Sequence, residues 1–131
     1  MTASVSSTAG NFPMKNQPFH KRLGYAGNGI RSAWRTEKSF RAQGIAALGV
    51  VLVLAWRQPP VMWWAFLLIN TGLVLAAELF NTALERLVDH LHPEIHPAIG
   101  LAKDCAAGGV LILSVTAVCV FAAFVADTFA V

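Results

Sequence analysis

The chain has 131 residues, of which 56% are hydrophobic and 13% are charged, and its formal net charge is +3. Soluble domains carry about 25% charged residues, so the composition excludes an ordinary soluble domain and indicates one membrane-embedded domain. The positive charge does not indicate nucleic-acid binding. Seven of the ten Lys and Arg residues precede the first long apolar segment, and the aromatic residues are not interleaved with them as a base-stacking surface requires.

The N-terminal part of the chain changes character near residue 19. Residues 1–18 are polar and lack the apolar core of a signal peptide, so we expect a disordered tail. In residues 19–36 apolar side chains recur at helical spacing, with basic side chains between them. A basic amphipathic helix lies along a membrane surface beside anionic headgroups. We therefore predict a surface helix over residues 19–36.

Three apolar segments follow, and we interpret them as membrane-spanning helices over about residues 37–57, 61–90 and 98–128. A helix needs about 20 apolar residues to cross the hydrocarbon core. Pro59 and Pro60 end the first segment. With the basic N-terminal part in the cytoplasm, the His- and Pro-rich loop between the last two spans is also cytoplasmic. The C-terminus then lies on the outer side of the membrane.

The motif "AAELFNTALERLVD" (residues 76–89) places polar side chains where the second apolar segment would continue. Successive helical residues are about 100° apart, so Glu78 and four polar residues within roughly 60° of it share one face. We call them the acidic stripe: Glu78, Asn81, Thr82, Glu85 and Asp89. Acidic groups beside a bilayer are costly unless they face protein, water or a metal ion. The stripe therefore indicates a functional face.

Plainer roles remain open for single residues. Glu85 and Asp89 would also solvate the end of an emerging helix, with Arg86 paired to Asp89. The adjacent Lys103 and Asp104 would also serve as a charge pair at the start of the last helix. The loop between the last two spans contains His90, His92 and His96. They could form a metal site, but no carboxylate or thiol at a suitable spacing accompanies them, so we expect them to be solvated.

Polar residues from three segments are expected to meet near the inner membrane interface: Glu37, Glu78, Asn81, Glu85, Asp89, Lys103 and Asp104. Carboxylates and an amide without a thiolate suit a hard cation such as Mg²⁺, and a lysine binds phosphate as a point charge. Phosphoryl transfer needs these parts, together with a base for the attacking hydroxyl. The sequence contains neither a P-loop nor a GxGxxG motif, so any nucleotide site must differ from those designs.

Three motifs together resemble the prokaryotic diacylglycerol kinase family: "GIRSAWRTEKSFRAQG", "AAELFNTALERLVD" and "AKDCAAGGVLI". The resemblance covers about residues 21–118 without a gap. It implies an enzyme of the bacterial inner membrane, with its N-terminus in the cytoplasm and its C-terminus in the periplasm. It also implies an all-α homotrimer of three-span subunits, each with a surface helix, in which neighbouring subunits share active sites. The implied reaction transfers the γ-phosphate of ATP to a lipid hydroxyl with Mg²⁺.

The resemblance implies a role for each site residue. Glu78 matches the catalytic base, and Glu37 and Glu85 match the carboxylates that bind the metal ion and nucleotide. The positions matching nucleotide or phosphate contacts are Lys21, Tyr25, Glu37, Glu85, Asp89, Lys103 and Asp104. The positions matching the lipid substrate site are Arg31, Trp34, Glu78 and Asn81. The chain departs from the family pattern at Pro18 and Gln43, where a basic and an acidic residue are expected.

Two other functions compete with diacylglycerol phosphorylation. The family also contains undecaprenol kinases, although the segments "GIRSAW" and "FRAQG" favour the diacylglycerol branch. A non-enzymatic subunit, such as a cation-conducting oligomer lined by the acidic stripe, belongs to a different class. A pore would carry its acidic residues through the depth of the bilayer, whereas here they gather at one end beside Lys103 and Asp104. This distribution favours the enzyme.

Overall fold

The computed structural model describes residues 16–130. Within this range the chain forms four helices and no strand: α1 (Phe19–Thr36), α2 (Lys38–Arg57), α3 (Val61–Leu91) and α4 (Pro97–Phe129). The last three are long and apolar enough to cross a membrane. The predicted fold class, an all-α membrane protein with one amphipathic helix and three spans, is confirmed. The tail predicted for residues 1–18 lies, up to residue 15, outside the described residues.

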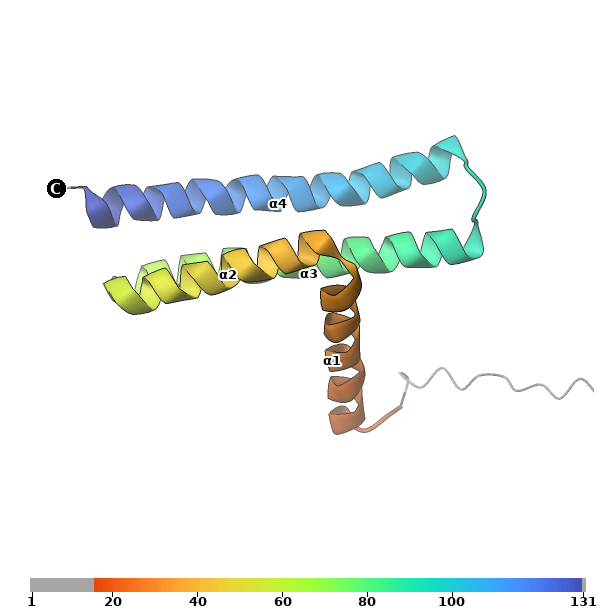
Figure 1. The fold of residues 1–131 in the computed structure, drawn as a ribbon, viewed down its shortest axis with the longest axis horizontal. Helices are drawn as coiled ribbons and strands as arrows, with labels where there is room; N and C mark the ends of the chain where they lie inside the picture. Colours follow the sequence, from red (N-terminus) through yellow and green to blue (C-terminus); the bar gives the residue numbers. More distant parts are fainter. Residues whose placement is uncertain (1–15, 131) are drawn as a thin grey trace, which may run out of the picture.

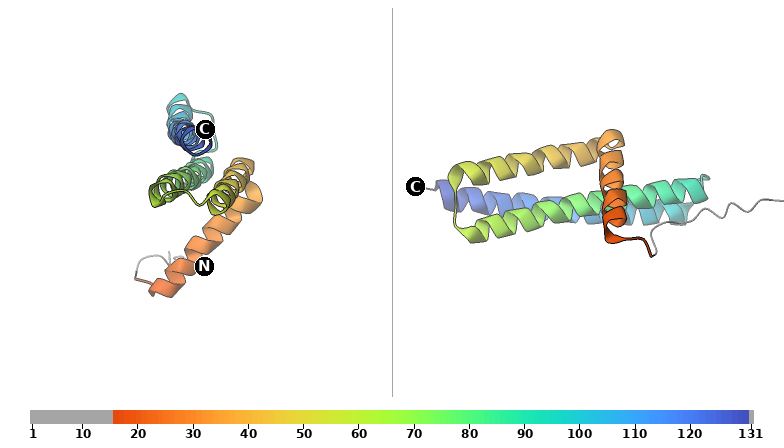
Figure 2. Two further views of the ribbon diagram at one scale, coloured as in Figure 1. Left: turned by 90° about the vertical axis from the view of Figure 1, so that its left-hand side faces the viewer. Right: turned by 90° about the horizontal axis from the view of Figure 1, so that it is seen from below.

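The three long helices run side by side, and α1 leaves the bundle at a steep angle (Figure 1). The views along and from below the bundle show α3 packed between α2 and α4, with α1 crossing α3 near the start of α2 (Figure 2). The α2–α3 turn and the C-terminus lie at one end, and the α3–α4 loop lies at the other. Both α3 and α4 continue beyond the level of α1, so their loop-proximal turns lie past the surface helix.

The helix ends follow from local backbone chemistry. Glu37 is the only residue between α1 and α2, and its extended backbone (φ −105°, ψ 114°) changes the chain direction. At the other end of α2, Gln58 adopts the left-handed conformation (φ 47°, ψ 53°). Pro59 and Pro60 then follow, and proline cannot continue a helix. These two breaks separate the surface helix from the first span and the first span from the second.

The apolar core is small and lies toward the α2–α3 turn, where Leu54, Leu67 and Phe124 are buried. Polar contacts hold the end of α4 there. Arg57 donates from Nη2 to the carbonyl oxygen of Thr128 at 2.7 Å, and its guanidinium carbon lies 4.2 Å from the centroid of the Phe129 ring. Most other large apolar side chains on the spans are exposed in the single subunit. Lipid or a neighbouring subunit would cover such surfaces in a membrane.

Candidate active site

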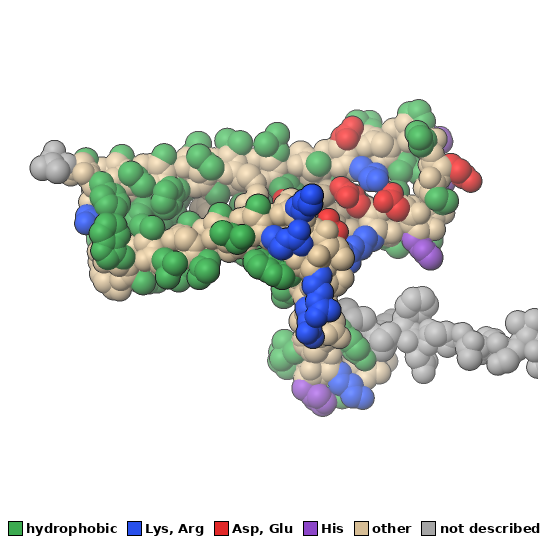
Figure 3. Space-filling model, viewed as in Figure 1, with side chains coloured by type: hydrophobic (Ala, Val, Ile, Leu, Met, Phe, Trp, Pro, Cys, Tyr) green, Lys and Arg blue, Asp and Glu red, His purple; other side chains and the backbone are tan. Residues whose placement is uncertain are grey.

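Charged side chains gather at one end of the bundle. Basic side chains lie over α1 and its junction with α2, and acidic side chains lie toward the α3–α4 loop, while the opposite end is mostly hydrophobic (Figure 3). The acidic stripe enters this region from α3, Glu37 enters it from the α1–α2 junction, and Lys103 enters it from α4. This end of the bundle is therefore the place where apolar surface and charged groups meet.

Glu78 is the most deeply buried charged residue of the described chain, with 5% of its surface exposed. It lies on α3, and its Oε2 accepts a hydrogen bond from Ser39 Oγ of α2 at 3.2 Å. Thr82, one turn further along the same face, is 7% exposed. A buried carboxylate requires a hydrogen-bonding partner, and Ser39 supplies one without neutralising the charge. Glu78 is thus held in a defined position beside the apolar part of the bundle.

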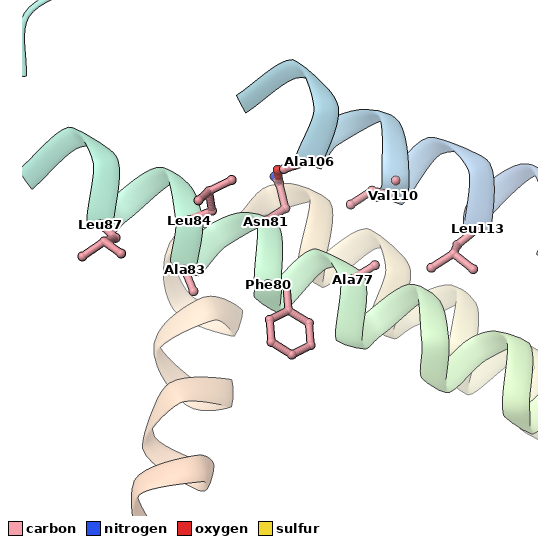
Figure 4. Close-up of a pocket in the computed structure, with 10 residues that line it drawn as sticks. Ala77, Phe80, Asn81, Ala83, Leu84, Leu87, Ala106, Val110 and Leu113 are labelled. Carbon is pink, nitrogen blue, oxygen red and sulfur yellow. The ribbon is translucent and has the colours of Figure 1, made fainter. Parts of the chain in front are cut away.

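Asn81 points from α3 toward Ala106 of α4 (Figure 4). It lines a groove of about 600 Å³ whose other walls are mainly apolar. Its Nδ2 donates to Glu85 Oε1 at 3.1 Å. Its Oδ1 is buried, and no donor among the described residues reaches it. A buried oxygen without a partner costs about 1–3 kcal/mol, so this atom indicates a place for a donor or a cation that arrives with a ligand.

Asp89 and Lys103 join the acidic stripe to α4. Lys103 Nζ donates to Asp89 Oδ1 at 2.9 Å, which ties the last turns of α3 to the first turns of α4. The neighbouring Asp104 is exposed. The pairing of Arg86 with Asp89, which the sequence left open, is wrong. Asp89 finds its cation on α4, and Arg86 lies on another face of α3.

Arg86 pairs with Glu37, and not with Asp89. Glu37 Oε1 lies 3.2 Å from Arg86 Nη2 and accepts a hydrogen bond from Thr36 Oγ1 at 3.1 Å. Glu37 and Glu85, the predicted metal ligands, therefore have different partners, because Glu85 is bonded to Asn81. Among the described residues, no three His, Cys, Asp or Glu side chains form a metal-binding group. The donor set nevertheless fits Mg²⁺ carried by a nucleotide, since such sites use one or two carboxylates together with phosphate oxygens.

The predicted site residues of α1 fall into two groups. Trp34 lies in the last turns, where its ring packs edge to face against Phe40 of α2 with the centroids 6.3 Å apart. Arg31 lies one turn earlier and is exposed. Lys21 and Tyr25 lie in the first half of α1, which projects away from the bundle (Figure 1). One subunit therefore does not bring Lys21 and Tyr25 next to the acidic stripe.

Two contacts in this region were missed from the sequence. The hydrogen bond from Ser39 to Glu78 joins residues 39 positions apart, so the spacing within either helix gives no signal for it. The contact of Arg86 with Glu37 has no signal either, because helical spacing offers Asp89 as the partner of Arg86. Helical periodicity shows which side chains of one helix share a face, but it does not show which residue of a neighbouring helix lies opposite them.

The chain is similar to known proteins over most of its length. A family model described as prokaryotic diacylglycerol kinase matches residues 24–125. The chain is 36% identical over 98 residues to the diacylglycerol kinase of Escherichia coli K12, and the aligned region covers 75% of this chain and 80% of that protein. It is 34% identical over 97 residues to the undecaprenol kinase of Bacillus subtilis, covering 74% and 79% of the two chains. A diacylglycerol kinase of Helicobacter pylori is 33% identical over 92 residues, covering 70% and 72%.

The matched region contains the acidic stripe, the α1–α2 junction and the Lys103–Asp104 pair, which are the features that the structure brings to one end of the bundle. The sequence resemblance is therefore confirmed by the family match and by the similarity to enzymes that phosphorylate lipids. The chain belongs to the prokaryotic diacylglycerol kinase family.

Proposed function

We propose that the protein is a Mg²⁺-dependent kinase of the bacterial inner membrane that transfers the γ-phosphate of ATP to diacylglycerol, giving ADP and phosphatidate. The observation that carries this proposal is the position of the acidic stripe, with Glu78 buried against α2 and Asp89 bound to Lys103. The stripe starts beside the apolar spans and ends at the charged loop end of the bundle. A lipid hydroxyl and a water-soluble nucleotide can meet at this depth.

In the proposed reaction, Glu78 acts as the general base. Its carboxylate accepts the proton of the lipid hydroxyl while the hydroxyl oxygen forms a bond to the γ-phosphorus, and the bond between that phosphorus and the bridging oxygen breaks with its electrons going to ADP. The hydrogen bond from Ser39 orients the carboxylate. Lys103, on the adjacent α4, carries a positive charge suited to the phosphates. The buried Oδ1 of Asn81 can accept a hydrogen bond from a donor that arrives with the substrates.

Glu37 and Glu85 would hold the metal ion, and Asp89 and Asp104 would contact the nucleotide. Bound with ATP, Mg²⁺ would supply neutralisation of the phosphate charge during transfer. Glu37 and Glu85 come from different elements, so a nucleotide-bound metal ion would link the α1–α2 junction to α3. Arg31 and Trp34, on the last turns of α1, would contact the lipid near the membrane surface.

The proposed assembly is a homotrimer with shared sites, with the N-terminus in the cytoplasm and the C-terminus in the periplasm. Its support lies in what one subunit leaves incomplete. The first half of α1, which carries Lys21 and Tyr25, projects away from the bundle (Figure 1), so a neighbouring subunit would bring such nucleotide contacts to the acidic stripe. Small residues on α4, Gly108 and Gly109, leave open space around their Cα atoms and allow close helix approach.

The test is an assay of the purified protein in lipid–detergent mixed micelles with radiolabelled ATP, offering diacylglycerol and undecaprenol in parallel. We expect labelled phosphatidate as the main product. A preference for undecaprenol would assign the substrate named for the Bacillus subtilis relative instead. Phosphorylation of neither lipid by folded protein would overturn the proposal and leave the non-enzymatic alternative.

A further inference from the structure

Arg86 connects α3 to the junction between α1 and α2. It follows Glu85 in the sequence, but its side chain extends toward the surface helix and not toward α4. Nη1 donates to Ser32 Oγ at 3.0 Å, and Nη2 donates to Thr36 Oγ1 and to Glu37 Oε1, the latter at 3.2 Å. All three acceptors lie on the last turn of α1 or on the single residue that joins α1 to α2. One guanidinium thus binds both parts of the junction.

The carboxylate of Glu37 is held on one side only. Its two hydrogen bonds, from Thr36 and Arg86, both reach Oε1. Oε2 has no hydrogen-bond partner among the described residues, so it is free to contact a ligand. Glu37 lies between two helices with an extended backbone, so it is not part of a helix that would restrict the direction of its side chain. The direction of this carboxylate therefore depends on Arg86 and Thr36.

A second arginine, Arg41, holds the end of α1 through hydrogen bonds to its backbone. Arg41 Nη1 donates to the carbonyl oxygens of Trp34 and Arg35, each at 3.0 Å. These bonds fix the end of α1 relative to α2, but they do not reach α3. Ser39 ties the first turn of α2 to Glu78 on α3. Among the described polar contacts, only those of Arg86 tie the last turn of α1 and Glu37 to the helix that carries the acidic stripe.

We propose that Arg86 is a positioning residue for the kinase reaction: it holds Glu37 beside α3 so that Glu37 and Glu85 face the same metal-bound nucleotide. The inference rests on the proposed function for the assignment of Glu37 to the metal-bound nucleotide. Arg86 and Glu85 are adjacent on α3, so one turn of this helix carries one of the two carboxylates and the group that places the other. The planar guanidinium directs separate nitrogens at a serine hydroxyl and at a carboxylate, which a single ammonium group cannot reproduce.

A purely structural ion pair gives a different expectation. The Arg86 and Glu37 side chains are 45% and 32% exposed, and exposed pairs contribute little to folding. In that case, substitution of Arg86 would leave the nucleotide requirement unchanged. Outer partners that orient metal ligands behave differently, because their loss typically lowers metal affinity or activity by about 10–100-fold.

The experiment compares Arg86→Lys and Arg86→Gln with wild type in the same mixed micelles. The matched control is Arg57→Lys, because Arg57 also donates to a helix end but lies at the opposite end of the bundle. We expect Arg86→Lys and Arg86→Gln each to raise the KM for Mg-ATP about tenfold, the lower end of the range for such partners, with a smaller effect on kcat. Arg57→Lys should leave this KM unchanged.

A second measurement is independent of turnover. Hydrogen–deuterium exchange without nucleotide should increase at the α1–α2 junction in Arg86→Lys, where the Glu37 amide donates to the Ala33 carbonyl oxygen at 2.8 Å. In Arg57→Lys, exchange should increase at the end of α4 instead. The double variant Ser32→Ala/Thr36→Val keeps the arginine and its contact with Glu37, but it removes the two hydroxyl acceptors of Arg86 and the hydrogen bond from Thr36 to Glu37. It should also raise the KM for Mg-ATP, and an unchanged KM in this variant would count against the inference.

Three results would overturn the positioning role. The first is an unchanged KM and unchanged junction exchange in both Arg86 variants. The second is a normal KM in Arg86→Lys with a raised KM in Arg86→Gln, since charge alone would then act directly on phosphate. The third is normal junction exchange in Arg86→Lys. If wild type phosphorylates neither lipid, the proposed function fails, and the exchange measurement alone still decides whether Arg86 orders the junction.

Discussion

Glu78 combines deep burial with a single described hydrogen-bond partner, Ser39. Glu78→Gln keeps the shape of the side chain and removes its basicity. Because a positioned general base contributes about 10²–10⁴-fold, we expect a loss of kcat of that order with the oligomer intact by size-exclusion chromatography. Glu94→Gln, in the exposed α3–α4 loop, is the matched control and should retain full activity. A near wild-type kcat in Glu78→Gln at saturating lipid and ATP would exclude this residue as the base.

Glu37 and Glu85 should bind the metal ion that accompanies the nucleotide. Replacing either by Gln removes one negative charge from the oxygen-rich set, so a higher Mg²⁺ concentration or more nucleotide should be needed for half-maximal rate. We expect this shift in Mg²⁺ titrations at fixed ATP, or a complete loss of activity. Mg-ATP titration curves that match wild type in both variants would contradict the role of these carboxylates.

At the residue scale, the sequence predicted contacts within one helix better than contacts between helices. The spacing of Asn81 and Glu85 brings them together on α3, and they are bonded in the structure. The same arithmetic allowed Arg86 to pair with Asp89, and that was wrong. Lys103 reaches Asp89 from α4, and Glu37 attracts Arg86 from the other side. The choice between these partners depends on how the helices pack, which local spacing does not contain.

At the scale of elements, α1 meets α2 through a close approach of Trp34 to Gly44. A Cβ added at Gly44 would overlap the Trp34 ring, with Cη2 at 3.2 Å and Cζ3 closer. Overpacking of this kind costs about 1–3 kcal/mol. Gly44→Ala should therefore displace Trp34, lower the free energy of unfolding and reduce activity.

Gly49 offers the control for this substitution, because no atom lies within 4 Å of an added Cβ there. Gly49→Ala should be neutral or stabilising by about 0.5–1 kcal/mol, as expected for alanine replacing glycine in a helix. Unfolding of both variants can be followed by circular dichroism in detergent. In the double variant Gly44→Ala/Trp34→Leu, the smaller side chain at position 34 makes room for the added methyl group, so the free energy of unfolding should recover. Equal stability of Gly44→Ala and Gly49→Ala would show that α1 yields without cost.

The elements themselves were foreseeable because their ends carry strong local signals. Pro59 and Pro60 end α2, and Pro97 opens α4 at a position where its missing N–H costs nothing. The steep angle of α1 was not foreseeable. It is set at a single extended residue, Glu37, and maintained by Arg41 and by the contact of Trp34 with Gly44. Those contacts join residues of different helices, and helical periodicity does not predict such contacts.

For the whole molecule, one subunit leaves much of its function unexplained. Its buried core lies toward the α2–α3 turn, whereas the charged groups lie at the opposite end with α4 on one side and α1 on the other (Figure 3). Polar groups facing hydrocarbon cost several kcal/mol each, so this end requires further cover. The first half of α1 meanwhile carries Lys21 and Tyr25 away from the bundle. Both features support the proposal that a neighbouring subunit completes the site.

Subunit mixing tests this arrangement. If Lys21 acts on a neighbouring subunit's acidic stripe, then Lys21→Met and Glu78→Gln remove groups that one site takes from two different chains. Each variant alone should have low activity. Unfolding a 1:1 mixture and reconstituting it should restore up to about one quarter of the wild-type rate, because a closed ring assembled at random places both intact contributions at that fraction of its interfaces.

The pair Glu37→Gln and Glu85→Gln provides the contrast. Arg86 of one subunit binds Glu37 of the same subunit and directly follows Glu85 in the chain, so both carboxylates should reach a site together from one chain. Mixing these two variants should therefore restore nothing, while wild type carried through the same unfolding recovers its rate. Recovery in this second pair would mean that Glu37 acts on a neighbouring stripe. No recovery in the Lys21 and Glu78 pair would instead place each site within a single subunit, and α1 would then have to fold back toward its own α3.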